Sequence, residues 1–63
     1  MKKLKQFRNE LGWSQVKLSN RSGVSQTYIS ELESGGKNPT LPIVRKLAKA
    51  LDKEPSELID EEE

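Results

Sequence analysis

The stretch from Ser14 to Ser34 constrains the fold of this chain more than any other part of the sequence. It reads SQVKLSNRSGVSQTYISELES, which is two short amphipathic runs separated by a single glycine, Gly23. Glycine lacks a Cβ atom and adopts positive φ readily, so it suits a tight turn. A serine stands at the start of each run, Ser14 and Ser25, where its hydroxyl can cap the first helical turn. The pattern predicts two helices joined by a tight turn, the helix-turn-helix unit.

Apolar spacing and terminal residues extend this prediction to an all-α fold of five helices, with no strand pattern or repeat. We expect Gly12 to end the first helix and Thr40 to cap the fourth. The predicted helices cover about residues 2–11, 15–22, 26–35, 41–51 and 55 to 59 or 60. The residues expected on the inward faces are Leu4, Phe7, Leu11, Leu18, Ser19, Ser22, Val24, Ile29, Leu32, Leu41, Val44, Leu47, Ala48 and Leu51.

Composition narrows the classes of function. The chain has 63 residues, of which 32% are hydrophobic, enough for one small domain with a thin core. It contains no Cys and no His, which removes the commonest catalytic bases and metal ligands. We therefore expect no enzyme activity, no cofactor and no metal. No apolar run approaches the roughly 20 residues of a membrane span, and no secretory signal is visible, so a cytoplasmic location is expected.

Charge is distributed unevenly along the chain. Residues 1–51 carry ten Lys and Arg against three Glu, whereas residues 52–63 carry one Lys against seven acids. The basic part is suited to a polyanion, although a solvated surface of mixed charge is the plainer alternative. We expect the domain to occupy residues 1–59. The last four residues, 60–63, are expected to form a disordered acidic tail that lacks the ligand spacing of a calcium loop.

An ordered set of residues makes the chain resemble the phage repressor/Cro-type (XRE-like) helix-turn-helix family, over about residues 3 to 59. The resemblance implies a five-helix DNA-binding domain. The matching positions are Leu4, Phe7, Arg8, Leu11, Gly12, Trp13, Ser14, Gln15, Leu18, Ser19, Gly23, Val24, Ser25, Tyr28, Ile29, Ser30, Leu32, Glu33, Ser34, Gly35, Asn38, Pro39, Leu41, Leu47, Ala48, Lys49, Ala50 and Leu51.

The second helix of such a unit lies in the major groove of DNA and reads base edges with its first residues. Gln26 is the best candidate, because its amide can pair with adenine N6 and N7. Thr27 offers a hydroxyl and a methyl group, and Ser30 lies one turn further on the same side. Glu31 could accept a hydrogen bond from a cytosine amine or be a solvated acid. We expect base contacts from Gln26, Thr27, Ser30 and Glu31.

A second group of residues is expected to contact the DNA backbone. Gln15 begins a helix whose free N–H groups favour a phosphate, and the matching Gln of the family touches DNA. Tyr28 is expected to touch sugar-phosphate rather than core, and Ser25 is also expected to contact the DNA backbone. Lys37 and Asn38 are phosphate candidates in a loop, where a plain turn is the alternative.

Two further features are expected to be structural. In the resembling family, positions matching Arg8 and Glu33 join the first helix to the third, and a guanidinium–carboxylate fork suits a partly buried bridge. Two separate surface charges are the alternative. Trp13 is expected to cover the core at the corner between the first two helices rather than to stack on a ligand.

The sequence therefore favours a sequence-specific regulator of transcription that binds double-stranded DNA, a repressor acting as a dimer on a pseudo-palindromic operator. We expect a weak homodimer that is completed on DNA through Pro55, Leu58 and Ile59. Two alternatives share this fold: a coactivator-like protein-interaction module, and the antitoxin of a toxin–antitoxin pair.

Overall fold

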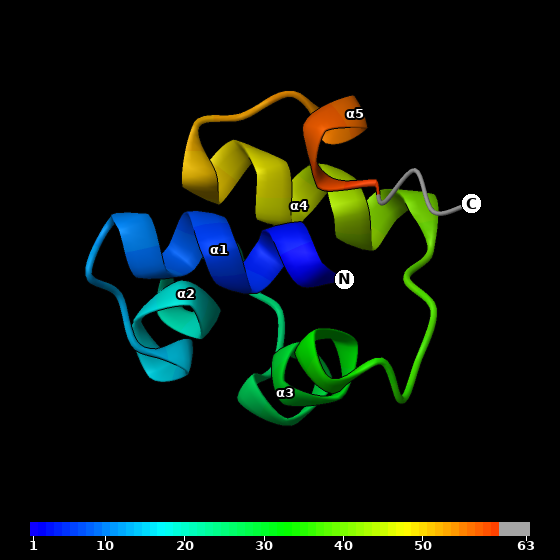
Figure 1. The fold of residues 1–63 in the computed structure, drawn as a ribbon, viewed down its shortest axis with the longest axis horizontal. Coiled ribbons are helices and arrows are strands. Elements are labelled where there is room, and N and C mark those ends of the chain that lie inside the picture. Colours follow the sequence, from blue (N-terminus) through cyan, green and yellow to red (C-terminus); the bar gives the residue numbers. More distant parts are fainter. Residues whose placement is uncertain (60–63) are drawn as a thin grey trace.

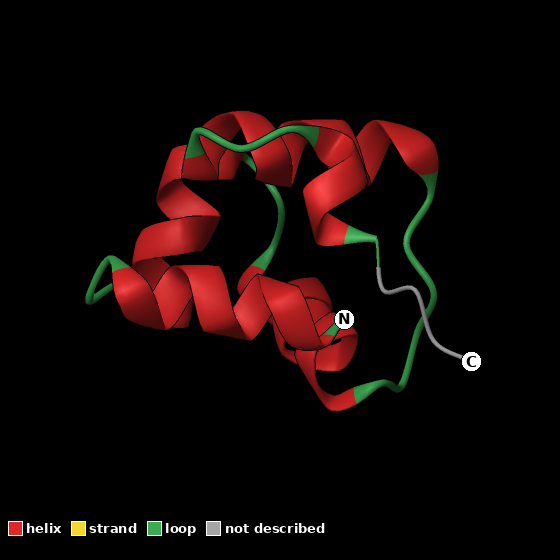
Figure 2. Cartoon of the chain, turned by 45° about the horizontal axis from the view of Figure 1, so that its top comes forward, coloured by secondary structure: helices red, strands yellow, loops and turns green. Residues whose placement is uncertain are grey.

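The computed structural model of the chain describes residues 1–59, and this part contains five helices and no strand (Figures 1 and 2). The all-α prediction is confirmed. The acidic residues 60–63, expected to form a tail, lie outside the described residues. The helices are α1 (Lys2–Glu10), α2 (Gln15–Ser22), α3 (Gln26–Ser34), α4 (Leu41–Leu51) and α5 (Pro55–Leu58).

One hydrophobic core holds the five helices together. In Figure 1, α1 crosses the middle of the molecule, with α4 and α5 on one side and α2 and α3 on the other. Residues of all five helices and of the turn after α2 meet between them. The buried core consists of Leu4, Phe7, Leu18, Val24, Ile29, Leu32, Val44, Leu47, Ala48, Leu51 and Leu58.

Two leucines that were expected on inward faces are exposed. Leu11 is 49% exposed because α1 ends at Glu10, and Leu41 is 53% exposed because it is the first residue of α4. A side chain at a helix end lies beyond the stripe that packs on the core. Leu58 shows the reverse, since it is completely buried although its helix has only four residues.

The turn chemistry inside the helix-turn-helix unit is as predicted. The Ser14 hydroxyl accepts a hydrogen bond from the Lys17 amide at 3.0 Å, and the Ser25 hydroxyl accepts one from the Tyr28 amide at 3.1 Å. Gly23 between them has φ +79°, in the left-handed region where a Cβ atom is strained. These contacts fix where α2 ends and α3 begins, and so they set the angle at which α3 is presented.

The caps of the last two helices differ from the prediction. Thr40 is the N-cap of α4, but its side chain accepts no capping hydrogen bond. Pro42 occupies the second helical position and has no N–H, which removes one of the two amides that a cap usually accepts from. Helix α5 ends at Leu58 rather than at residue 59 or 60, and Glu54 and Glu57 form a capping box at its start that the sequence analysis missed.

Candidate nucleic-acid interface

The residues proposed to read DNA bases lie together on the surface of α3. Helix α3 buries Ile29 and Leu32, which turns its opposite side toward solvent. On that side the structure has an open hollow of about 330 Å³, called here the α3 hollow. It is lined by the four candidate base readers and one candidate backbone residue, Gln15, Gln26, Thr27, Ser30 and Glu31. Side chains from α2 and α3 therefore present hydrogen-bonding groups to one place.

The other four candidates for backbone contact differ in their exposure and in their contacts within the chain. Ser25 is exposed, although its hydroxyl already caps α3, and Asn38 is exposed in the loop before α4. Tyr28 differs from the expectation, because it is half-buried and packs against the core. The Lys37 ammonium lies 5.4 Å from the centre of the Tyr28 ring. Lys37 thus folds back toward α3, although its side chain remains 56% exposed.

A nearly buried ion pair fixes α3 to α1. Arg8 Nε donates to Glu33 Oε2 at 2.7 Å and Arg8 Nη2 donates to Glu33 Oε1 at 2.9 Å, the two-point fork expected from the sequence. A third donor, Arg8 Nη1, donates a hydrogen bond to the Trp13 carbonyl at 2.6 Å, and this contact stabilises the corner between α1 and α2. The predicted bridge is present, and it holds the turn between α1 and α2 as well as the two helices.

Gln15 takes part in the same network, a contact that the sequence analysis missed. Its Nε2 donates to Glu33 Oε1 at 3.1 Å. Gln15 also lines the α3 hollow, so one amide connects the buried ion pair to the candidate interface. No sequence signal joins these positions, because they are 18 residues apart and the contact depends on how α2 packs on α3.

The environment of Glu33 lowers its pKa. Burial acts in the opposite direction and is the largest single influence, but the hydrogen bonds from Arg8 and Gln15 and the charge of Arg8 outweigh it. The pKa of Arg8 is raised by the same hydrogen bond. The pair is therefore charged at neutral pH.

This shift predicts a loss of stability in acid. A carboxyl group with a lowered folded-state pKa contributes fully above its unfolded pKa of about 4.3, and that contribution is lost as the pH falls toward the folded-state pKa. We expect the unfolding free energy of Glu33→Gln to fall less steeply than that of the parent below about pH 4.3. Urea melts between pH 7 and pH 2.5 measure both slopes, and parallel slopes would contradict the prediction.

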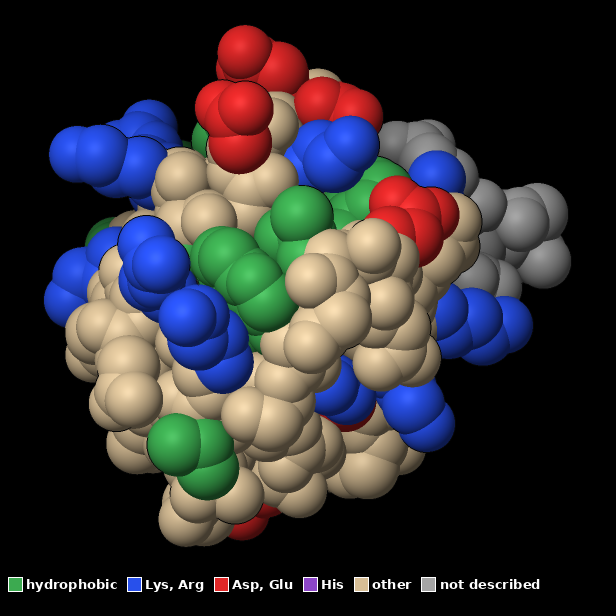
Figure 3. Space-filling model, turned by 90° about the vertical axis from the view of Figure 1, so that its left-hand side faces the viewer, with side chains coloured by type: hydrophobic (Ala, Val, Ile, Leu, Met, Phe, Trp, Pro, Cys, Tyr) green, Lys and Arg blue, Asp and Glu red, His purple; other side chains and the backbone are tan. Residues whose placement is uncertain are grey.

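The corner between α1 and α2 forms a separate mixed surface. Figure 3 shows the side of the molecule that includes this corner, with hydrophobic side chains near the centre, Lys and Arg side chains on both sides and Asp and Glu side chains toward the top. Trp13 is half-buried and packs against the core, as expected of a cover. The Lys17 ammonium and the Arg21 guanidinium lie 6.0 and 5.6 Å from the centre of its ring. The tryptophan is thus occupied by contacts within the chain.

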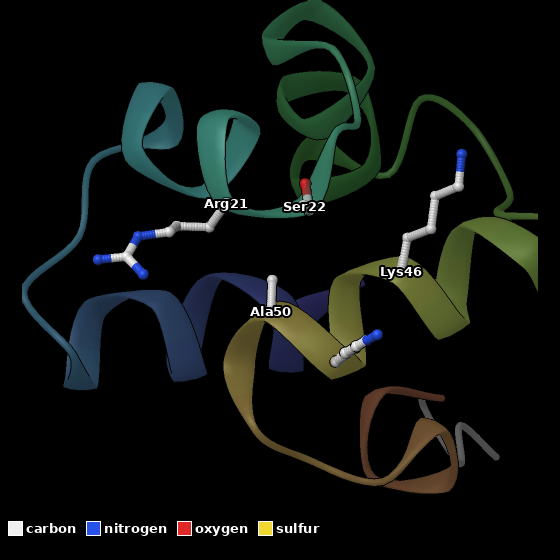
Figure 4. A pocket seen from close by; sticks show the side chains of 5 residues that line it. Arg21, Ser22, Lys46 and Ala50 are labelled. Carbon is white, nitrogen blue, oxygen red and sulfur yellow. The ribbon is translucent and has the colours of Figure 1, made fainter.

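A second open hollow, of about 500 Å³, lies between α2 and α4. It is lined by Arg21, Ser22, Lys46, Lys49 and Ala50, none of which is a candidate from the sequence. Figure 4 shows Arg21 and Lys46 extending in different directions, so their charges do not converge on one point. The lining of this hollow is positively charged, because it includes Arg21, Lys46 and Lys49. The α3 hollow is the better candidate site, because the candidate base readers line it.

Within residues 1–59, no group of three or more acidic side chains could hold a metal ion, and none of the helices is long and apolar enough to cross a membrane.

Comparisons with known proteins agree with this geometry. A family model described as helix-turn-helix matches residues 4–58. The chain belongs to this helix-turn-helix family. The helix-turn-helix chain is 43% identical over 53 residues to an uncharacterized HTH-type transcriptional regulator, y4dJ, of Sinorhizobium fredii, in an alignment that covers 84% of the chain and 69% of the relative. It is 37% identical over 59 residues to control protein C.BamHI of Bacillus amyloliquefaciens, with 92% and 73% covered.

A solved structure extends the comparison to three dimensions. The helix-turn-helix chain superposes on the restriction-modification controller protein C.AhdI of Aeromonas hydrophila with a TM-score of 0.88 and 40% sequence identity. The alignment covers 92% of this chain and 88% of that protein. The resemblance to Cro/C1-type regulators inferred from the sequence is confirmed, and this is a family of DNA-binding regulators rather than of enzymes.

Proposed function

We propose that the protein regulates transcription by binding a specific double-stranded DNA site with α3 in the major groove. The observation that carries this proposal is the α3 hollow, where amide, hydroxyl and carboxylate groups of two helices face solvent together. Such groups distinguish base pairs by their donors and acceptors in the major groove. A module that binds only proteins would not need this set of exposed polar side chains on α3. An antitoxin that binds DNA with the same fold would use them too, and it differs in having a toxin as a second partner.

Roles within the interface follow from side-chain chemistry. Gln26 pairs with an adenine, and Thr27 and Ser30 contact neighbouring bases. Gln15 meets a phosphate at the start of α2, where free N–H groups and the helix dipole favour an anion. Ser25 and Asn38 are both exposed, and they contact the backbone, which sets the register of the protein on the duplex.

Selection of bound duplexes from a random pool tests the proposal, and Gln26→Ala identifies the reader. We expect this variant to lose about 1–3 kcal/mol of affinity for the selected site and to relax the choice at one base position. Asn20→Ala, which changes an exposed amide of α2 outside the α3 hollow, is the control and should bind as the parent does. Unchanged affinity and preference in Gln26→Ala would show that α3 is not the reader.

We further propose that two copies bind one pseudo-palindromic operator and repress transcription, with half-sites about 10 bp apart. Two copies together then read twice as many base pairs as the α3 helix of one copy can read. Of the three residues expected at the contact between copies, Leu58 is completely buried and is not available. Ile59 is 47% exposed and Pro55 is half-buried, so any contact in this region depends on them.

Sedimentation with and without a two-half-site duplex tests the dimer. We expect a monomer in dilute solution and two copies on the duplex, with weaker cooperativity in Ile59→Asp. Strict one-to-one binding to that duplex would overturn this arrangement and leave the proposal for base reading intact.

A further inference from the structure

Glu31 is the one acidic residue among those that line the α3 hollow, and it is paired. Its Oε1 lies 3.3 Å from Lys37 Nζ, and both side chains are about half exposed. The same ammonium lies over the Tyr28 ring at 5.4 Å. Lys37 therefore contacts two residues on successive turns of α3 while it belongs to the following loop.

The end of α3 explains why Lys37 returns to the helix. Gly35 has φ +87°, and the amide of Gly36 donates to the Glu31 carbonyl at 2.8 Å. This left-handed cap reverses the chain at once, as such caps do at helix ends. The loop therefore starts close to the turn that carries Glu31, and the lysine side chain reaches its carboxylate from there.

The ion pair of Glu31 and Lys37 reduces the repulsion between the carboxylate and DNA phosphates that is expected on a surface facing DNA. A carboxylate near several phosphates is repelled by each of them, and the repulsion grows where water is displaced. An ammonium 3.3 Å away offsets the charge of Glu31 and leaves its oxygens as acceptors. Within the described residues, Glu31 Oε2 has no hydrogen-bond partner, so it is free to meet a base.

An ionised carboxylate only accepts hydrogen bonds, and this limits the base that it can meet. In the major groove cytosine presents its N4 amine as a donor, whereas thymine O4 and guanine O6 and N7 are acceptors that repel a carboxylate. Adenine offers an N6 donor with the N7 acceptor beside it. A carboxylate in this position therefore fits cytosine best.

We propose that Glu31 and Lys37 act as one unit that selects cytosine at a single position of the half-site. Glu31 is the specificity-determining residue. Lys37 is a positioning residue that holds and neutralises the carboxylate, so it is more than a phosphate contact. This inference rests on the proposed function, because it requires α3 to lie in the major groove.

The test is selection from a random duplex pool with the parent, Glu31→Gln, Lys37→Met, Lys37→Arg and the double variant Glu31→Gln/Lys37→Met. We expect the parent to prefer cytosine over other bases at one position by about 5- to 150-fold. Glu31→Gln should lose this preference, because an amide both donates and accepts. Lys37→Met should lose it in part, and Lys37→Arg should restore it.

Lys46→Met is the matched control, because it removes an exposed lysine that lies at the α2–α4 hollow. It should keep the cytosine preference and lower affinity for all duplexes alike, if at all. In the double variant, the loss of Lys37 should cost less affinity for the selected site than it costs in the parent, because the carboxylate is gone. Thermal melts of each variant report whether the fold is retained.

Two results would overturn the inference alone. One is an unchanged base preference in Glu31→Gln at every position. The other is a Lys37→Met variant that weakens all duplexes equally, by the same factor with or without Glu31. A parent that enriches no duplex would overturn the proposed function itself and this inference with it.

Discussion

Arg8→Met is expected to destabilise the fold by about 3–5 kcal/mol, because it leaves the Glu33 carboxylate nearly buried without its counterion. The side chains of the pair are only 10% and 5% exposed. The total stability of a domain of this size is about 3–9 kcal/mol, from roughly 0.05–0.15 kcal/mol per residue. The variant should therefore be partly or wholly unfolded at 37 °C, and urea melts with circular dichroism at 15 °C measure the loss.

The double variant Arg8→Met/Glu33→Gln separates the ion pair from other effects of Arg8. It removes both charges, so it should lose less than the sum of the two single losses. The Trp13 carbonyl also loses its donor in both variants that lack Arg8, so that contribution cancels in the comparison. Losses that add within about 0.5 kcal/mol would show that the two charges do not stabilise the fold together.

Leu58→Ala is expected to cost about 2–5 kcal/mol, because it creates a cavity in a fully buried site. The neighbouring Ile59 provides a matched control, since it is apolar and 47% exposed. Ile59→Ala should change the stability by about 0.5 kcal/mol or less. Thermal and urea melts compare the two, and equal effects would mean that α5 does not dock on the core in solution.

Local chemistry in the sequence was sufficient to predict much of this fold. Ser14 and Ser25 stand directly before amphipathic runs, and Gly23 stands between them, so the two caps and the turn follow from neighbouring residues. The polar positions Gln26, Thr27 and Ser30 share one side of α3 because a helix has 3.6 residues per turn. Their placement around one hollow also follows once Ile29 and Leu32 are assigned to the core.

Most of the features that could not be predicted from the sequence depend on tertiary packing. Leu58 and Ile59 are adjacent apolar residues near the end of the chain, and nothing local shows which of them packs on the core. The contact of Gln15 with Glu33 and that of Lys37 with Glu31 depend on rotamers of long side chains. The capping box of Glu54 and Glu57 is the exception, because it is local; it was missed because two acids at the start of a short helix also look like ordinary surface charge.

The hydrogen bond between Gln15 and Glu33 has a consequence for association. An unrestrained glutamine loses rotamer freedom when it meets a phosphate, and such ordering weakens binding by about 0.5–1.5 kcal/mol per side chain. In this chain the ordering occurs when the protein folds, and it is maintained by an ion pair that does not touch the ligand. For the proposed phosphate contact of Gln15, the buried charges of α1 and α3 thereby lower the entropy that is lost on binding, and loosening them should weaken the affinity for DNA even where the helices remain folded.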